Sequence, residues 1–266
     1  MIRTASWGCG LQSTTMIAMS VLGDLPILDH VIFCDLGWER AETYATLDWY
    51  TEFIEEAGVP VHVLRTGNIR KNGGKPHAHI PFWTENGGPL RRQCTRHYKI
   101  RPPRRHIRRL LGLDPTLPPN PQPNSVEQWI GITTDEHQRA RASEVDYITN
   151  RYPLLQAGMS RNDCGRYLYE HGLPIPPKSA CIGCPYRKAS EWIDMRDTAP
   201  EEWEEACLFD QEIRHHPLDR IETASLYVYR HRVPLAEADL EADAAREHTA
   251  DQLPLFLLPL QRQQQC

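Results

Sequence analysis

The first 65 residues alternate short apolar runs with helical segments, and this order constrains the fold more than any other feature. Ile2–Ser6 is typical of a strand that enters a glycine-containing turn, and Ser13–Leu22 has helical character. His30–Cys34 is an apolar, β-branched run, which predicts a buried parallel strand. An amphipathic helix over Ala41–Ala57 and a third strand over Val59–Arg65 follow. Strand–helix–strand–helix–strand at this pace predicts an α/β fold.

The remainder of the chain extends this pattern and adds a cysteine-bearing end. A fourth strand is expected at Gln128–Ile132, and a basic helix with prolines in its first turn at Ile100–Leu111. Ser160 is an N-cap signal for a helix that carries Cys164, and the chain is largely helical from about residue 192. We expect a Rossmann-like parallel sheet of about five strands flanked by helices. Residues 1–150 would form this core, and 151–266 a C-terminal helical extension packed on it as one structural unit.

Composition limits the classes of protein to consider. The 266 residues are 40% hydrophobic and 24% charged, as in ordinary soluble domains. The sequence has no apolar run of about 18 residues and no secretory leader pattern, so we expect a cytoplasmic protein without a membrane partner. Eight cysteines in such a chain indicate a reducing compartment, where thiols bind metals or do chemistry.

The opening turn has the composition of an anion site. Gly8 and Gly10 stand between the first strand and the first helix, where backbone N–H groups can approach a phosphate. Ser6, Ser13 and Thr14 add hydroxyl groups. The turn fits neither G-x-G-x-x-G nor the lysine-bearing P-loop, and a plain tight turn is the alternative. Its position after the first strand of an α/β pattern favours the anion site.

Carboxylates follow two of the predicted strands. Asp35 and Glu39 come after the second strand, and Asp135 and Glu136 after the fourth. Carboxylates at the carboxyl edge of a sheet can hold ribose hydroxyls or Mg²⁺, and Arg139 is a nearby phosphate partner. Ordinary turn residues are the alternative in both places. We predict Asp35, Asp135 and Glu136 as catalytic candidates.

Four cysteines are candidate metal ligands. Cys181 and Cys184 form a C-x-x-C whose sulfurs can reach one ion, although a redox dithiol is the alternative. Context adds Cys94 and Cys164, because four thiolates close either a zinc site or an iron–sulfur site. Cys9 is expected to be a packing residue near the nucleotide site.

The net charge of −5 conceals a basic segment at residues 91–109, which holds nine Lys/Arg residues, two histidines and no acid. A solvated helix face is one interpretation, and phosphate-bearing partners, either a nucleotide or a nucleic acid, are the one we favour. The predicted contacts are Arg96, Lys99, Arg101, Arg104, Arg105 and Arg108.

Several ordered motifs together resemble the phosphoadenosine-phosphosulfate reductase family, in particular a branch common in phages and actinobacteria. The opening turn SWGCGLQSTTM is similar to the family's modified PP-loop, usually S-x-G-G-G-x-Q-S-T, with Cys9 in place of a glycine. The other matches are FCDLGWERAETY (33–44), RRQCTRHYKIRP (91–102), QWIGITTDEHQR (128–139), NRYPLL (150–155), SRNDC (160–164) and KSACIGCPY (178–186).

The resemblance implies a HUP-type adenine-nucleotide α-hydrolase fold that binds ATP or a related adenine nucleotide with Mg²⁺. Gln12, Gly37 and Arg139 would join the opening turn in this binding. The resemblance also implies a 4Fe-4S cluster, with zinc as the alternative. The family's first Cys-Cys pair is here Gln93-Cys94, so Cys164 becomes the candidate for the missing ligand. DNA-phosphorothioation sulfurtransferases share the combination of PP-loop and cluster.

The function expected from these features is ATP-dependent activation of a substrate for sulfur transfer in nucleic-acid modification. DNA or RNA would be the acceptor, and a cysteine desulfurase is a candidate sulfur donor. Two alternatives stay open: a sulfonucleotide reductase, and a non-catalytic nucleotide- or DNA-binding subunit of a modification or defence complex. The reductase needs a cysteine on the C-terminal tail, where this chain has Cys266. The oligomeric state is also open, a homodimer included.

Overall fold

The computed structural model describes residues 1–71, 80–215 and 225–252. Contacts divide the chain into two units. The first comprises residues 1–79 and 93–181, and the second residues 80–92 and 182–266. This division differs from the predicted boundary at 150/151, because the segment from 151 to 181 packs against the helices of the first unit. The C-x-x-C pair spans the boundary, with Cys181 in the first unit and Cys184 in the second.

A five-stranded sheet in the order β3-β2-β1-β5-β6 forms the centre of the first unit, and every neighbouring pair is parallel. This confirms the predicted α/β fold. Ala5 stands opposite Val31 on one side and Trp129 on the other, so β1 is central. The strands are β1 (Ile2–Trp7), β2 (His30–Asp35), β3 (Val61–Arg65), β5 (Val126–Ile130) and β6 (Ile148–Arg151).

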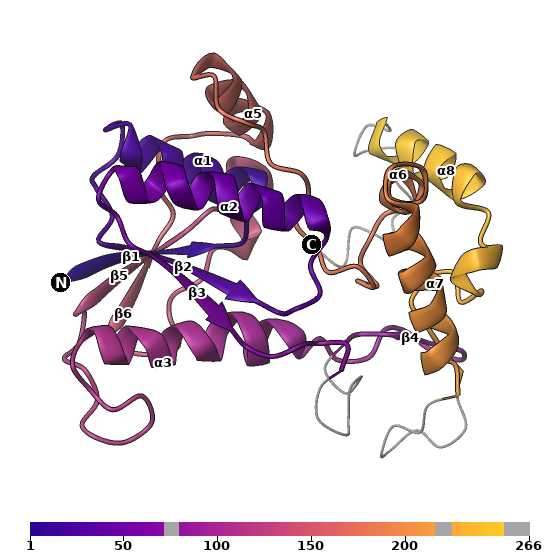
Figure 1. The fold of residues 1–266 in the computed structure, drawn as a ribbon, viewed down its shortest axis with the longest axis horizontal. Helices are drawn as coiled ribbons and strands as arrows, with labels where there is room; N and C mark the ends of the chain where they lie inside the picture. Colours follow the sequence, from indigo (N-terminus) through magenta and orange to yellow (C-terminus); the bar gives the residue numbers. More distant parts are fainter. Residues whose placement is uncertain (72–79, 216–224, 253–266) are drawn as a thin grey trace. The chain divides into compact units, whose positions relative to one another are not determined.

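Helices cover both faces of this sheet (Figure 1). On one face, α1 (Leu11–Val21), α2 (Ala41–Glu56) and α5 (Arg161–Glu170) enclose a core that includes Met16, Ile54 and Leu168. On the other face, α3 (Arg101–Leu110) encloses a smaller core around Ile107. Each helix thus buries an apolar stripe against the sheet, the usual three-layer solution for a parallel sheet.

The connections between strands create a switch point at the sheet centre. From β1 the chain runs outward through β2 to β3, and then returns to the other side of β1 to form β5 and β6. The strand order therefore reverses between β1 and β5. Ligands of open α/β sheets bind outside the carboxyl ends of the strands at such a point.

Local signals set the ends of several helices. The helix α5 begins with a capping box in which Ser160 accepts from the Asp163 backbone and Asp163 accepts from the Ser160 backbone. The helix α3 follows directly on a π-helix, η1 (Thr95–Ile100). π-Helical turns occur mostly as single turns and often at functional sites.

The second unit combines a two-stranded antiparallel sheet with three helices. The strands are β4 (Trp83–Thr84) and β7 (Leu226–Tyr227), and the helices α6 (Ala189–Thr198), α7 (Pro200–Ile213) and α8 (Leu240–Gln252). The fully buried Asp210 carboxylate accepts hydrogen bonds from the backbone N–H groups of Val228 and Leu235 and pairs with Arg214. In neither unit does any described helix combine the length and apolar character that a membrane span requires.

Candidate functional site

A pocket of about 280 Å³ opens at the switch point. Its walls come from the loop after β1, the start of α1, the end of β5, the turn after it, and the segments around 161 and 178. The lining residues are Gly8, Gly10, Leu11, Gln12, Ser13, Lys99, Gly131, Glu136, Arg139, Arg161, Lys178 and Ser179. The pocket therefore lies where the topology predicts ligand binding.

Cations predominate in this pocket. Lys99, Arg139, Arg161 and Lys178 line it, against the single lining carboxylate of Glu136. Glu136 pairs with Arg139 at 2.7 Å. The N-terminal end of helix α1 lies at the same pocket. Its first turn has no acidic residue, and no side chain caps it at Gly10. A helix N-terminus next to several cations favours an anionic ligand group.

The backbone of the opening turn leaves room for a ligand. A Cβ built on Gly8 would meet no atom within 4 Å, and one built on Gly10 would come no closer than 3.8 Å, at Ser179. The Ser13 hydroxyl lies 3.4 Å from the Gly8 N and 3.1 Å from the Gly10 carbonyl oxygen. Cys9 has φ 52°, in the left-handed region that favours glycine. The chain thus keeps a glycine-like conformation at the position where Cys9 replaces the glycine of the resembled motif.

Side chains at the rim are held by hydrogen bonds. The Arg161 guanidinium donates to the Gln12 side chain at 3.0 Å, and the Arg161 backbone N–H donates to Asp135 at 2.5 Å. Asp135 therefore fixes the start of α5 and does not line the pocket. Gln12, Ser13, Lys99, Glu136 and Arg139 are the predicted polar side chains that the pocket gathers.

The other predicted residues stabilise local turns or pack in the core. Thr14 is buried and accepts from the Trp7 indole at 3.0 Å, and Ser6 accepts from Gln128 at 3.2 Å. Asp35 accepts from the Gly37 backbone at 2.7 Å and from the Tyr44 hydroxyl at 2.9 Å. Gly37 has φ 66°, and an added Cβ would lie 3.0 Å from the Gly67 carbonyl oxygen. Asp35 and Gly37 therefore build the turn after β2, and the lining of the pocket includes neither.

A buried carboxylate lies behind the pocket. Glu39 is 3% exposed and pairs with Lys99 at 3.6 Å, and its Oε1 lies 3.8 Å from the Cys181 sulfur. Glu39 and Cys181 also form an isolated antiparallel bridge. Burial, with the nearby Glu39 charge, raises the pKa of the Cys9 thiol far above its usual range. Burial likewise raises the pKa of Cys34 to about 12. Cys9 and Cys34 are neutral packing thiols, as expected for Cys9.

The four cysteine candidates occupy different environments. Cys164 is fully buried in the core between α1 and α5, and burial raises the pKa of its thiol to about 11. Cys94, Cys181 and Cys184 are each partly exposed. Among the described residues, no three His, Cys, Asp or Glu side chains are arranged to hold a metal ion. The four-cysteine centre stays a prediction, and Cys164 has the surroundings of a packing residue.

The basic segment divides into structural and exposed side chains. Arg108 is 7% exposed, and its guanidinium donates to the carbonyl oxygens of Asp114, Leu117 and Pro119 and to Asn120. It holds the proline-rich loop and is not exposed for a nucleic acid, so the structure does not support this predicted contact. Arg104 pairs with Glu144 at 3.2 Å. Arg96, Arg101 and Arg105 are exposed, whereas Lys99 lines the switch-point pocket.

Five lining residues were not singled out in the sequence: Leu11, Gly131, Arg161, Lys178 and Ser179. All of them lie inside the motifs on which the family resemblance rests. The available signal for these residues was a glycine at position 131 and cations at positions 161 and 178 within those motifs. Their convergence depends on the packing of α5 and of the segment before Cys181 against the opening turn.

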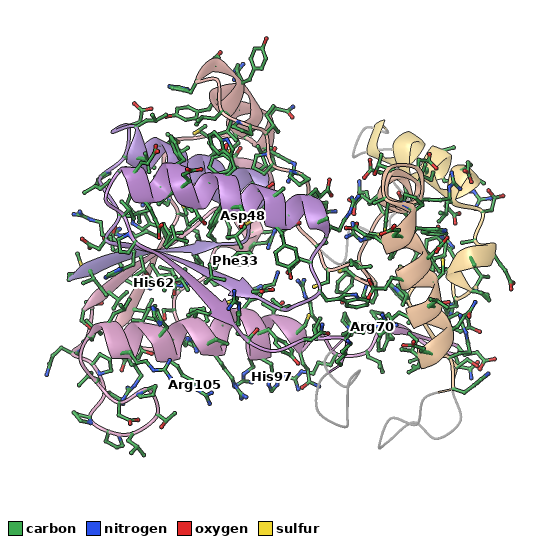
Figure 2. The ribbon with its side chains drawn as sticks, in the orientation of Figure 1. Phe33, Asp48, His62, Arg70, His97 and Arg105 are labelled. Atoms are coloured by element: carbon green, nitrogen blue, oxygen red, sulfur yellow. The ribbon has the colours of Figure 1, made fainter. Side chains whose placement is uncertain are left out.

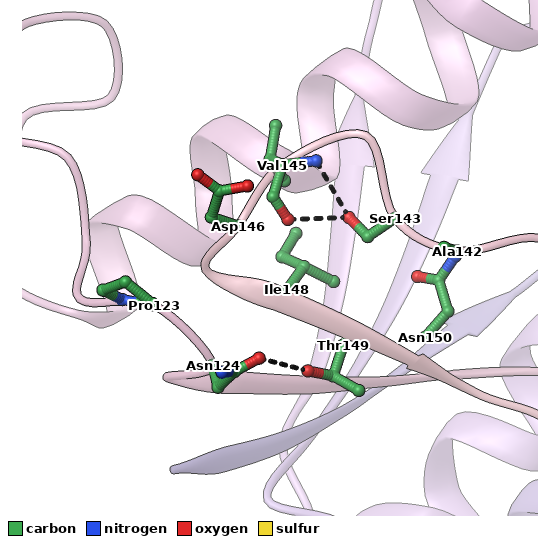
Figure 3. A pocket seen from close by; sticks show the side chains of 9 residues that line it. All are labelled: Pro123, Asn124, Ala142, Ser143, Val145, Asp146, Ile148, Thr149 and Asn150. Atoms are coloured by element: carbon green, nitrogen blue, oxygen red, sulfur yellow. Dashed lines mark hydrogen bonds between the residues drawn. The ribbon is translucent and has the colours of Figure 1, made fainter.

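A second hollow of about 410 Å³ lies at the β6 edge (Figure 3). Within it Thr149 donates to Asn124 at 2.9 Å, and the Ser143 hydroxyl bonds to the Val145 backbone. Asp146 is the one titratable residue in the lining. These polar groups satisfy one another, so the hollow lacks the convergent charges of the switch-point pocket.

No protein-family model matches the chain, and comparison with curated proteins finds no match. Among solved structures, the chain matches a phosphoadenylyl-sulfate (PAPS) reductase from Candida auris in a phosphate complex. The TM-score is 0.40 at 13% identity, over 66% of this chain and 74% of that chain. At this TM-score the match carries no information on ligand or reaction.

Proposed function

We propose that this chain is a PP-loop enzyme that binds ATP, or a related adenine nucleotide, at the switch point and activates a substrate for sulfur transfer. One observation carries the proposal. The glycine turn, the open N-terminus of α1 and four lining cations all meet in one pocket at the point where the strand order reverses.

The pocket suits chemistry at phosphorus. Attack of a substrate oxygen on the α-phosphorus would form a phosphate ester and release pyrophosphate, which leaves with the electron pair of the broken bond. A sulfur nucleophile would then attack the substrate atom that bears the activated oxygen, and this oxygen would leave with the bond's electron pair as part of the nucleoside monophosphate. The backbone N–H groups near Gly8 and the cations of Lys99, Arg139, Arg161 and Lys178 would position the phosphates and stabilise their developing charge.

The two predicted metal cofactors fit this structure differently. Mg²⁺ is usually bound through one or two carboxylates together with substrate phosphates, and Glu136 is the carboxylate that lines the pocket. For the iron–sulfur centre, Cys164 does not fit, because its side chain is enclosed by the apolar core. No step of the proposed reaction uses that centre.

The acceptor we propose is a nucleic acid, because exposed cations of the basic segment lie in the same unit as the pocket. A cysteine desulfurase is the kind of partner that would supply the sulfur. Cys266, which a sulfonucleotide reductase would need, lies outside the described residues.

Calorimetric titration with ATP and Mg²⁺ tests the proposal. Gly8→Leu should weaken ATP binding at least tenfold, because the new side chain enters the open space of the pocket without a clash at its Cβ. Gly165→Ala is the matched control: Gly165 lies within α5, and an added Cβ meets only Leu11, at 4.0 Å. Equal affinity of the wild type and Gly8→Leu would contradict nucleotide binding at this turn.

Product analysis separates the reaction classes. Release of pyrophosphate from ATP in the presence of an acceptor supports activation. Reduction of a sulfonucleotide with thioredoxin, without ATP turnover, would instead make the chain a reductase. Nucleotide binding without turnover of either substrate would leave a binding subunit.

A further inference from the structure

A separate groove of about 440 Å³ lies between the end of β3 and the helix α3, within the first unit. One wall comes from the edge strand of the sheet and the other from the basic helix. The lining residues are Val63, Leu64, Arg65, Thr66, His97, Pro102, Arg105 and Arg109. None of these residues lines the switch-point pocket.

The charges of this groove are of one sign. Arg65, Arg105 and Arg109 are exposed, and among the residues that the structure describes none of them forms an ion pair. The described lining includes no carboxylate. Figure 2 shows Arg105 on the basic helix and His97 before the start of that helix. Three exposed arginines without acidic partners create a positive potential that attracts polyanions.

The spacing of the cations is linear. Arg105 and Arg109, which line the groove, are four residues apart on α3, so they share one helix face with a rise of about 6 Å between them. Arg101 lies one turn earlier on the same face, outside the lining. The lining also contains apolar residues, namely Val63, which is 39% exposed, Leu64 and Pro102. Cations beside apolar side chains match a strand of phosphates that carries flat bases.

We propose that this groove binds a single-stranded nucleic acid, with the arginines on its phosphates and the apolar lining residues against its bases or sugars. The inference extends the proposed function. It rests on that function for the role of the bound strand as the acceptor. It also changes the set of predicted nucleic-acid contacts. Arg65, His97 and Arg109 are added to this set, and Arg108 is removed from it.

The π-helix η1 connects this groove to the switch-point pocket. His97 lines the groove and Lys99, two residues later, lines the pocket. A strand held along α3 would therefore contact the same short helix that contributes a cation to the nucleotide site. This arrangement gives the strand a defined route toward the reacting phosphates.

Fluorescence anisotropy with a labelled single-stranded DNA of about 20 nucleotides tests the groove in the full chain. The variant R65Q/R109Q should weaken binding at least tenfold. Between about 50 and 200 mM salt, the slope of log Kd against log salt should fall by about 1.4, because each lost phosphate contact on a single strand changes it by about 0.7. The control R141Q/R166Q removes the same charge from two exposed arginines outside the groove and should bind within about twofold of wild type.

Three outcomes would overturn the proposal: equal weakening by both double variants, unchanged binding by R65Q/R109Q, or tighter binding of the matching duplex than of the single strand. Calorimetric titration with ATP distinguishes a failure of the groove proposal from a failure of the proposed function. If R65Q/R109Q loses DNA binding and keeps its ATP affinity, the groove is supported. If wild-type protein binds DNA through Arg65 and Arg109 but does not bind ATP, the groove stands and the proposed function fails.

Discussion

Gly131 lies directly against Ser13: a Cβ built on Gly131 would be 2.7 Å from both the backbone N and the Cα of Ser13. Ser13 belongs to the first turn of α1, and Gly131 follows the end of β5. The two residues lie on opposite sides of the switch point. Their contact brings the end of β5 up to the nucleotide turn and needs a residue without a side chain.

Gly131→Ala should therefore disturb stability and nucleotide binding together. Backbone atoms of Ser13 must move to admit the methyl group, at a cost of about 1–3 kcal/mol in the free energy of unfolding. Urea unfolding and ATP titration measure the two effects. Gly165→Ala should keep ATP affinity and gain up to about 1 kcal/mol from helix propensity. Wild-type stability in Gly131→Ala would show that the contact is looser than described.

Arg108→Met should destabilise the protein through the proline-rich loop. The guanidinium bonds to Asp114, Leu117, Pro119 and Asn120 would be lost, and we expect a decrease of about 2–3 kcal/mol in the free energy of unfolding. Arg105→Met, at an exposed position of the same helix, should change it by less than about 0.5 kcal/mol. Equal effects of the two variants in urea unfolding would contradict the structural role of Arg108.

A histidine cluster on the α3 face of the sheet predicts a pH dependence of stability. The His62 Nε2 lies 3.1 Å from the His30 Nδ1, and the His62 ring is tilted against that of His106, with ring centroids 4.4 Å apart. Burial, together with the charges of His62, Arg109 and His30, lowers the pKa of His106 from 6.5 to about 4. Between these two pH values the unfolded chain binds a proton at this residue and the folded chain does not.

The contribution of His106 to the free energy of unfolding should therefore be fully present above pH 6.5 and should be lost as the pH falls toward about 4. His106→Gln should reduce the slope of this decrease, because the residue can no longer take up the proton on unfolding. His171→Gln, at the exposed C-terminal end of α5, is the control and should keep the wild-type slope. An identical slope in His106→Gln would refute the assignment to this ring.

Cys164→Ala distinguishes packing from metal ligation. Because the thiol lies in the core between α1 and α5, its loss should lower the free energy of unfolding by about 1 kcal/mol. Iron and zinc content per mole, measured after purification without oxygen, should not change. Cys207→Ala is the control on α7, in the second unit. A loss of metal in Cys164→Ala alone would restore Cys164 as a ligand.

The sequence predicted those elements whose residues carry the signal themselves. The strand His30–Asp35 contains the uninterrupted apolar run Val31–Cys34, and Ser160 caps α5 through bonds within four residues. By contrast, β6 (Ile148–Arg151) was not expected, because it is short and polar. It is a strand only through its pairing with β5 at the sheet edge.

The same distinction applies to the site. The glycine turn between β1 and α1, the fold class and the basic character of α3 followed from residue types and their local order. The assignment of each cation did not. Arg108 and Arg105 are three residues apart on one helix, yet one is buried under a loop and the other faces a groove. Sequence patterns report backbone preference over a few residues. Only the tertiary structure decides which distant segments, such as those bearing Arg161 and Lys178, meet the opening turn, because burial and charge depend on what packs alongside.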